Sequence, residues 1–63
     1  MSDPRIRAIL NYLLLAVAKF PDRDADLIHM CDLADEAGEP ISARNAARLN
    51  ALYLKVKGDF THD

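Results

Sequence analysis

The amino-terminal segment carries more apolar surface than a small helical protein can easily bury. Residues 4–20 are expected to form a helix whose core stripe repeats at spacings of four and three residues: Ile6, Leu10, Leu13, Val17 and Phe20. A second, shorter stripe of Ala8, Tyr12 and Leu15 lies on nearly the opposite side of this helix. A helix that is apolar around most of its circumference must be surrounded by other elements. The segment therefore predicts a partner, either a second copy of the chain or another macromolecule.

The length of 63 residues limits how that surface can be covered. A chain this short forms one domain at most, and it buries a smaller share of its surface than a larger protein does. Small folds are commonly reinforced by disulfides, metals, oligomerisation or dense packing. Cys31 is the only cysteine, which excludes a disulfide within one chain, and only His29 and His62 could join it around a metal. We therefore expect dense helix packing and self-association, with no metal and no cofactor.

Capping and helix-stopping residues divide the chain into three helices, with no strand signal between them. These residues are Asp3, Pro4, Pro21, Gly38, Ser42 and Gly58. The helices are expected at about 4–20, 24–37 and 43–57, with 59–63 as a frayed C-terminal tail. We thus predict an all-α, compact three-helix domain over residues 1–63, packed as a homodimer.

The spacing of apolar residues predicts which face of each later helix turns inward. In 24–37 the core line is expected at Leu27, Met30, Ala34 and Ala37, beside Cys31. In 43–57 the core line is expected at Ala46, Leu49, Tyr53 and Val56. Leu54 belongs to a second line on 43–57 that consists mostly of small residues, which allow another helix to approach closely. The apolar positions that lie outside the core lines are expected to form the dimer or partner interface: Ala8, Tyr12, Leu15 and Leu54.

The charges are sorted along the chain, although the net charge is only −2. Residues 22–39 are rich in Asp and Glu, whereas 43–57 carry a basic stripe of Arg44, Arg48 and Lys55. A small negative net charge gives no global field that draws the chain to nucleic acid or to an anionic membrane. The stripe is expected to be either a solvated face or a contact surface for phosphates or an acidic protein.

The residues around the turn between the expected helices 24–37 and 43–57 resemble the apolar frame of a helix-turn-helix motif. The frame consists of Leu33, Ala34, Ala37, Gly38, Ile41, Ala46 and Leu49, with the turn glycine four residues after an alanine as in that motif. Glu39 and Pro40 make the turn two residues longer than the usual form. In such motifs the second helix reads the major groove of DNA with residues near its start. The resemblance implies these DNA-facing positions: Ser42, Arg44, Asn45 and Arg48.

No residue pattern indicates a catalytic or cofactor site, so we do not expect an enzyme. The apolar run at 12–18 is shorter than the ~20 residues that span a bilayer, so we expect a cytoplasmic location and no membrane partner. The leading hypothesis is a small non-enzymatic protein-interaction or regulatory module, such as an adaptor, inhibitor or assembly factor, acting through an apolar helical surface. The alternative is a small helix-turn-helix transcriptional regulator that binds DNA with 43–57.

Overall fold

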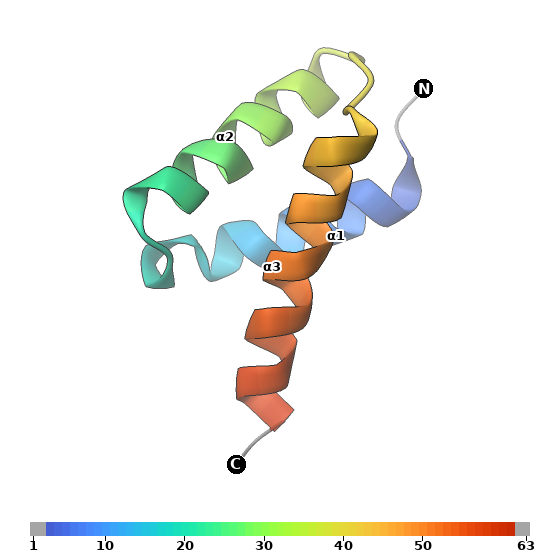
Figure 1. The fold of residues 1–63 in the computed structure, drawn as a ribbon. Coiled ribbons are helices and arrows are strands. Elements are labelled where there is room, and N and C mark those ends of the chain that lie inside the picture. Colours follow the sequence, from blue (N-terminus) through green and yellow to red (C-terminus); the bar gives the residue numbers. More distant parts are fainter. Residues whose placement is uncertain (1–2, 62–63) are drawn as a thin grey trace.

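Three α-helices and one short 3₁₀-helix make up the part of the chain that the computed structural model describes, which is residues 3–61, with side chains for 3–58. In chain order they are α1 (Pro4–Leu15), η1 (Val17–Lys19), α2 (Asp22–Glu36) and α3 (Ala43–Thr61). α2 folds back over α1, and α3 crosses α1 so that its C-terminal end projects away from the other helices (Figure 1). α1 packs against both α2 and α3 and is therefore the central element. The predicted all-α, three-helix architecture is confirmed for the described residues.

α1 begins where the sequence predicts and ends earlier than expected. The Asp3 carboxylate caps it by accepting a hydrogen bond of 2.9 Å from the backbone N–H of Arg5, and Pro4 lies in the first turn. The expected end near residue 20 is wrong, because the backbone tightens after Leu15 into η1. Tightened terminal turns satisfy carbonyl groups at a helix end, and here Pro21 prevents the helix from continuing.

α2 begins earlier than expected and ends as predicted. It starts at Asp22 rather than near residue 24, because the carbonyl of Pro21 already accepts two backbone N–H groups. At the other end Gly38 has a positive φ of 77°, and the N–H of Glu39 reaches the carbonyl of Ala34 at 2.9 Å. This is the Schellman arrangement, which glycine adopts with the least strain.

α3 begins as expected and runs further than expected. The Ser42 Oγ accepts a hydrogen bond of 3.1 Å from a backbone N–H of the first turn. The predicted end at residue 57 is wrong, because the helix continues through Gly58 to Thr61. Gly58 does not adopt a positive φ, and one glycine costs a helix interior only about 1 kcal/mol. Of the expected tail, 59–63, the side chains and the last two residues lie outside the described part of the chain.

The core confirms the predicted inward faces of the amino-terminal segment and of α3. Four aliphatic side chains are fully enclosed: Leu10, Leu13, Ile28 and Leu49. Ile6, Val17 and Phe20 complete the predicted stripe as partly buried neighbours. Val56 is buried at the far end of the α3 line. Fully burying one aliphatic side chain contributes about 1.5–3 kcal/mol, so this small set supplies much of the stability.

The predicted inward face of α2 is wrong in part: Leu27 and Cys31 are buried as expected. Met30 and Ala37 were expected in the core and are exposed. The buried positions of α2 are Leu27, Ile28, Cys31 and Asp35. Asp35 turns inward because its carboxylate pairs with Arg7 of α1. This orientation leaves Met30, 56% exposed, and Leu33, 66% exposed, on the surface.

Candidate interaction site

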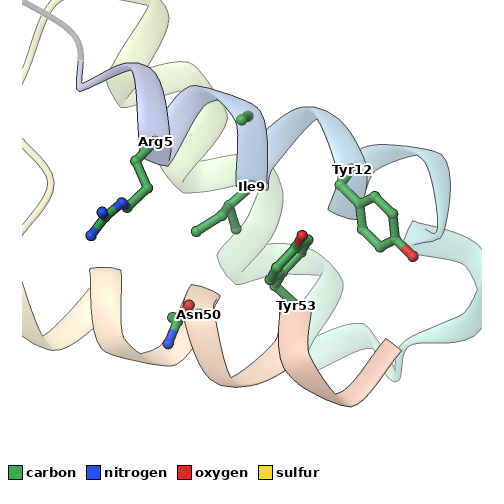
Figure 2. A pocket seen from close by; sticks show the side chains of 6 residues that line it. Arg5, Ile9, Tyr12, Asn50 and Tyr53 are labelled. Carbon is green, nitrogen blue, oxygen red and sulfur yellow. The ribbon is translucent and has the colours of Figure 1, made fainter. Parts of the chain in front are cut away.

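A groove follows α1 on the side where α3 crosses it. One hollow, of about 380 Å³, is lined from both helices by Arg5, Ala8, Ile9, Tyr12, Asn50 and Tyr53 (Figure 2). A second hollow, of about 220 Å³, is lined by Tyr12, Leu15, Ala16 and Lys19. Because Tyr12 lines both hollows, they form one continuous surface, which we call the α1–α3 groove.

Two tyrosine rings stand at the centre of the α1–α3 groove. Tyr12 of α1 and Tyr53 of α3 meet edge to face, with ring centroids 5.1 Å apart and planes at 79°. The Lys57 ammonium group lies 5.7 Å from the centroid of the Tyr53 ring, which is within cation–π range. Both rings are half-buried. The pair is therefore held in place by its own packing while part of its aromatic surface stays open.

Three of the four residues expected at a partner interface line this groove. Ala8, Tyr12 and Leu15 follow one another along α1. Leu15 is 90% exposed, so its side chain has almost no contact within the chain. Leu54 is also exposed but does not line either hollow; it lies one helical turn beyond Asn50 on α3.

The α3 side of the groove was not predicted as part of an interface. Asn50 received no assignment from the sequence, and Tyr53 was assigned to the core line of its helix. Tyr53 packs against the core, as predicted, and it also lines the groove. The phenol group of Tyr53 could have indicated its place at a surface groove, because a tyrosine at the edge of a core keeps its polar end near water.

The rim of the α1–α3 groove is basic. Arg5 lies at one end, Lys19 lines the other end, and Lys57 stands beside Tyr53. Within the described part of the chain, no Asp or Glu lines either hollow. The groove thus combines apolar walls with a positive rim, although the chain as a whole carries a net charge of −2.

The exposed side of α2 has the opposite charge. Its outer line repeats at spacings of four, three and four residues, and we call it the α2 face: Asp26, Met30, Leu33 and Ala37. Glu36 and Glu39 are exposed near its C-terminal end. A further hollow of about 270 Å³ adjoins Met30 where α2 meets the start of α3. The acidity of this surface was predicted from the sequence, but its apolar part was not, because Met30 was expected in the core.

An ionic cluster that was not predicted from the sequence joins α1 to α2. Arg7 donates hydrogen bonds of 2.7 Å to both Asp35 and Asp32, and one of 3.2 Å to the side-chain oxygen of Asn11. The hydrogen bonds to Asp32 and Asp35 raise the pKa of the Arg7 guanidinium further above its already high ordinary value. Asp35 is only 6% exposed, and a buried carboxylate needs such a partner. The cluster therefore fixes how α2 faces α1.

The residues expected to face DNA divide between surface and structural positions. Arg44, Arg48 and Lys55 are exposed, and none of them takes part in an ion pair within the described residues. Ser42 uses its hydroxyl oxygen to cap α3 by accepting the backbone N–H of Asn45, which is half-buried. The three cations remain available to a ligand, whereas Ser42 already has a structural role.

The described residues hold no arrangement of metal ligands and no exposed thiol. No three His, Cys, Asp or Glu side chains among them gather closely enough to hold a metal ion. Cys31 is buried, and burial raises the pKa of its thiol while the charge of Arg48 opposes that shift. A thiol that stays protonated is a poor nucleophile. No helix within residues 3–61 is both long and apolar enough to cross a membrane.

No protein-family model, curated protein or solved structure matches the chain. One fold can host many functions, so surface chemistry is the guide to the function of this chain. Three surfaces of the described residues are exposed: the α1–α3 groove, the α2 face and the basic stripe of α3.

Proposed function

We propose that this protein is a small, non-enzymatic interaction module that binds a partner protein through the α1–α3 groove. The observation that carries the proposal is the position of Leu15, 90% exposed, on a hollow continuous with an aromatic-lined groove. Single exposed leucines are ordinary on protein surfaces. Apolar side chains gathered along one groove and rimmed by polar groups are instead typical of protein-binding sites.

The shape of the groove suits a helical segment of the partner. α1 supplies one wall along its 12 residues, which span about 18 Å at 1.5 Å per residue. Helix-in-groove recognition uses apolar anchors that repeat at helical spacing along one face of the ligand. Tyr12 and Tyr53 offer rigid aromatic surface, which contributes strongly to protein interfaces. An adaptor, inhibitor or assembly factor would act in this way, and self-association of the chain belongs to the same proposal.

A display selection tests this function. Random helical peptides are selected on the immobilised full chain, and each enriched clone is then measured on three variants. Leu15→Glu and Leu54→Glu place a charge at the proposed interface, whereas Lys55→Glu places a glutamate at an exposed position of α3 that lines neither hollow and faces away from Asn50. All three positions are exposed, so we expect the fold to persist, as judged by circular dichroism.

The expected result is a set of clones that bind the wild type and the Lys55→Glu variant equally. Their affinity for Leu15→Glu should fall at least about tenfold, which corresponds to 1.4 kcal/mol. The loss for Leu54→Glu should be smaller, since Leu54 lies outside the lining of the groove. Absence of enriched clones, or clones indifferent to Leu15→Glu, would contradict the proposal.

DNA binding is a second candidate function, and the exposed cations Arg44, Arg48 and Lys55 favour it. Fluorescence anisotropy with a labelled mixed duplex at low salt tests it directly. A DNA-binding protein loses affinity steeply as salt rises, and Arg44→Ala or Arg48→Ala should lower both the affinity and the steepness. No binding at ~100 µM, the weak end of non-specific DNA affinity, would end this alternative.

A further inference from the structure

We infer that the α2 face of one copy of this chain binds in the α1–α3 groove of the next copy, so that copies associate head to tail. The inference rests on the proposed function of the groove and names its occupant. It joins two exposed apolar surfaces of the described residues, and these two surfaces carry charges of opposite sign.

The two surfaces are complementary in charge. The rim of the groove carries Arg5, Lys19 and Lys57, whereas Asp26 lies in the α2 face and Glu36 is exposed beside it. Opposite potentials across an interface fix the orientation of the partners and accelerate their encounter. A second copy therefore presents the negative, apolar helix that a positive, apolar groove favours.

The two surfaces also match in their apolar positions. Met30, Leu33 and Ala37 follow one another at spacings of three and four residues along one side of α2, which is the anchor pattern of a helix bound in a groove. The groove offers hollows of about 380 and 220 Å³ on either side of Tyr12. Met30 and Leu33 are more than half exposed, so docking would remove large apolar side chains from water.

A symmetric dimer through either surface is disfavoured. A two-fold interface brings the same patch of both copies together. Pairing groove with groove would oppose the basic rim to itself, with Arg5 and Lys19 among the facing groups. Pairing the α2 face with itself would oppose Asp26 and Glu36 to their own copies. Like charges set against each other cost several kcal/mol at an interface, so the unlike pairing is the one that suits both surfaces.

One copy can use both surfaces at once. The groove and the α2 face share no residue, and α2 lies behind α1 and α3 when the groove faces the viewer (Figure 2). Contacts between two different patches build a closed ring when the rotations between successive copies add up to a full turn. They build an open chain of copies when the rotations do not. The wild type is therefore expected to grow beyond a dimer as its concentration rises.

Complementation between two full-length variants tests the inference. Leu15→Glu disables the groove and leaves the α2 face intact, and Leu33→Glu does the reverse. Neither variant alone has both surfaces, so each should remain at the 7.0 kDa of one chain. In an equimolar mixture the intact α2 face of the first should bind the intact groove of the second, giving one-to-one pairs of twice that mass. The other pairing sets two introduced glutamates together and stays inactive.

Light scattering coupled to size exclusion, at concentrations up to ~1 mM, reads out each case. Lys55→Glu is the control, since Lys55 belongs to neither surface, and it should associate like the wild type. A dimer of Leu33→Glu alone would show groove-to-groove pairing, and a dimer of Leu15→Glu alone would show pairing through α2; either result overturns the inference. Should Leu33→Glu fail to fold by circular dichroism, Met30→Glu replaces it on the same face.

A wild type that stays monomeric over the whole range also overturns the inference. The proposed function is then judged separately, because peptides that bind the wild type and lose binding to Leu15→Glu would show that the groove takes a foreign helix. The charge contribution has its own readout. Arg5→Glu, at the groove rim, should weaken association of the otherwise wild-type chain at least about tenfold at low salt, and the difference should shrink as salt screens the rim.

Discussion

α1 closes its contact with α2 more completely than its contact with α3. Toward α2 it encloses Ile28 and adds the Arg7–Asp35 ion pair. Toward α3 it encloses Leu49, yet Tyr12 and Tyr53 stay beside an open groove. A chain of this size therefore has enough core side chains to complete one helix junction and only part of the other. The incomplete junction is where binding surface remains.

The largest expected effect is a loss of stability at the contact between α1 and α2, which we call the closed junction; the contact between α1 and α3 is the open junction. Ile28→Ala removes most of a fully enclosed side chain of α2 and should lower the free energy of unfolding by about 2–5 kcal/mol. Met30→Ala, on the same helix but exposed, should change it by no more than about 0.5 kcal/mol. Urea denaturation followed by circular dichroism measures both. A larger loss for Met30→Ala than for Ile28→Ala would show that α2 faces α1 with the side predicted from the sequence.

The next effect concerns the ion pair of the same junction. Asp35→Ala leaves Arg7 with Asp32 as its remaining carboxylate and should cost about 1.5–3 kcal/mol, the range for hydrogen bonds to charged groups. Asp35→Asn should cost less, because the amide oxygen still accepts a hydrogen bond from the guanidinium. Asp26→Ala, at an exposed position of α2, serves as the control in the same denaturation experiment. Equal losses for Asp35→Ala and Asp26→Ala would refute a structural role for the cluster.

A smaller effect is expected at the open junction. Tyr53→Leu removes the edge-to-face contact with Tyr12 and should cost about 0.5–1.5 kcal/mol. Tyr53→Phe keeps the ring and should remain close to the wild type in stability. The same two variants can be titrated with any peptide obtained by selection on the groove. If Tyr53→Phe were as damaging as Tyr53→Leu, the phenol oxygen rather than the ring would be holding α3 in place.

The smallest expected effect is a pH dependence that arises in the closed junction. Burial raises the pKa of the Cys31 thiol, and Arg48 partly offsets the shift. Above the ordinary thiol pKa of ~8.5 the unfolded chain releases this proton while the folded chain retains it. The contribution of the Cys31 thiol to the free energy of unfolding is therefore constant at lower pH and declines as the pH rises above the ordinary thiol pKa. Denaturation at neutral and alkaline pH should show a steeper decline for the wild type than for Cys31→Ala, and parallel curves would contradict the burial effect.

Three helix boundaries, at Asp3, Gly38 and Ser42, and two of the three inward faces could be predicted from the sequence because each rests on local chemistry. Asp3, Ser42 and Gly38 act within one turn of their own positions. The stripe through Leu10 and Leu13 repeats regularly enough that only one side of the helix can turn inward. Gly58 shows the limit of such rules, since a glycine permits a helix end without requiring one.

The orientation of α2 could not be predicted in the same way. Its apolar residues form two competing lines, and periodicity alone does not choose between Ile28 and Met30. The choice follows from Arg7, which lies on another helix and pairs with Asp35 across a long stretch of sequence. The groove could be predicted only in part, for a related reason. Ala8, Tyr12 and Leu15 repeat at helical spacing on α1, so the sequence indicates them. Asn50 and Tyr53 line the same groove only because α3 crosses α1 there.

The sorting of charge between helices has a consequence at distances where no side chains touch. All lysines and arginines except Arg23 lie outside α2, while α2 holds most of the acidic residues. A nearly neutral molecule with this arrangement has a large electric dipole moment, so two copies that diffuse together experience a torque before they collide. Within a Debye length of about 8 Å at physiological ionic strength, they would rotate so that the negative side of one approaches the positive side of the other.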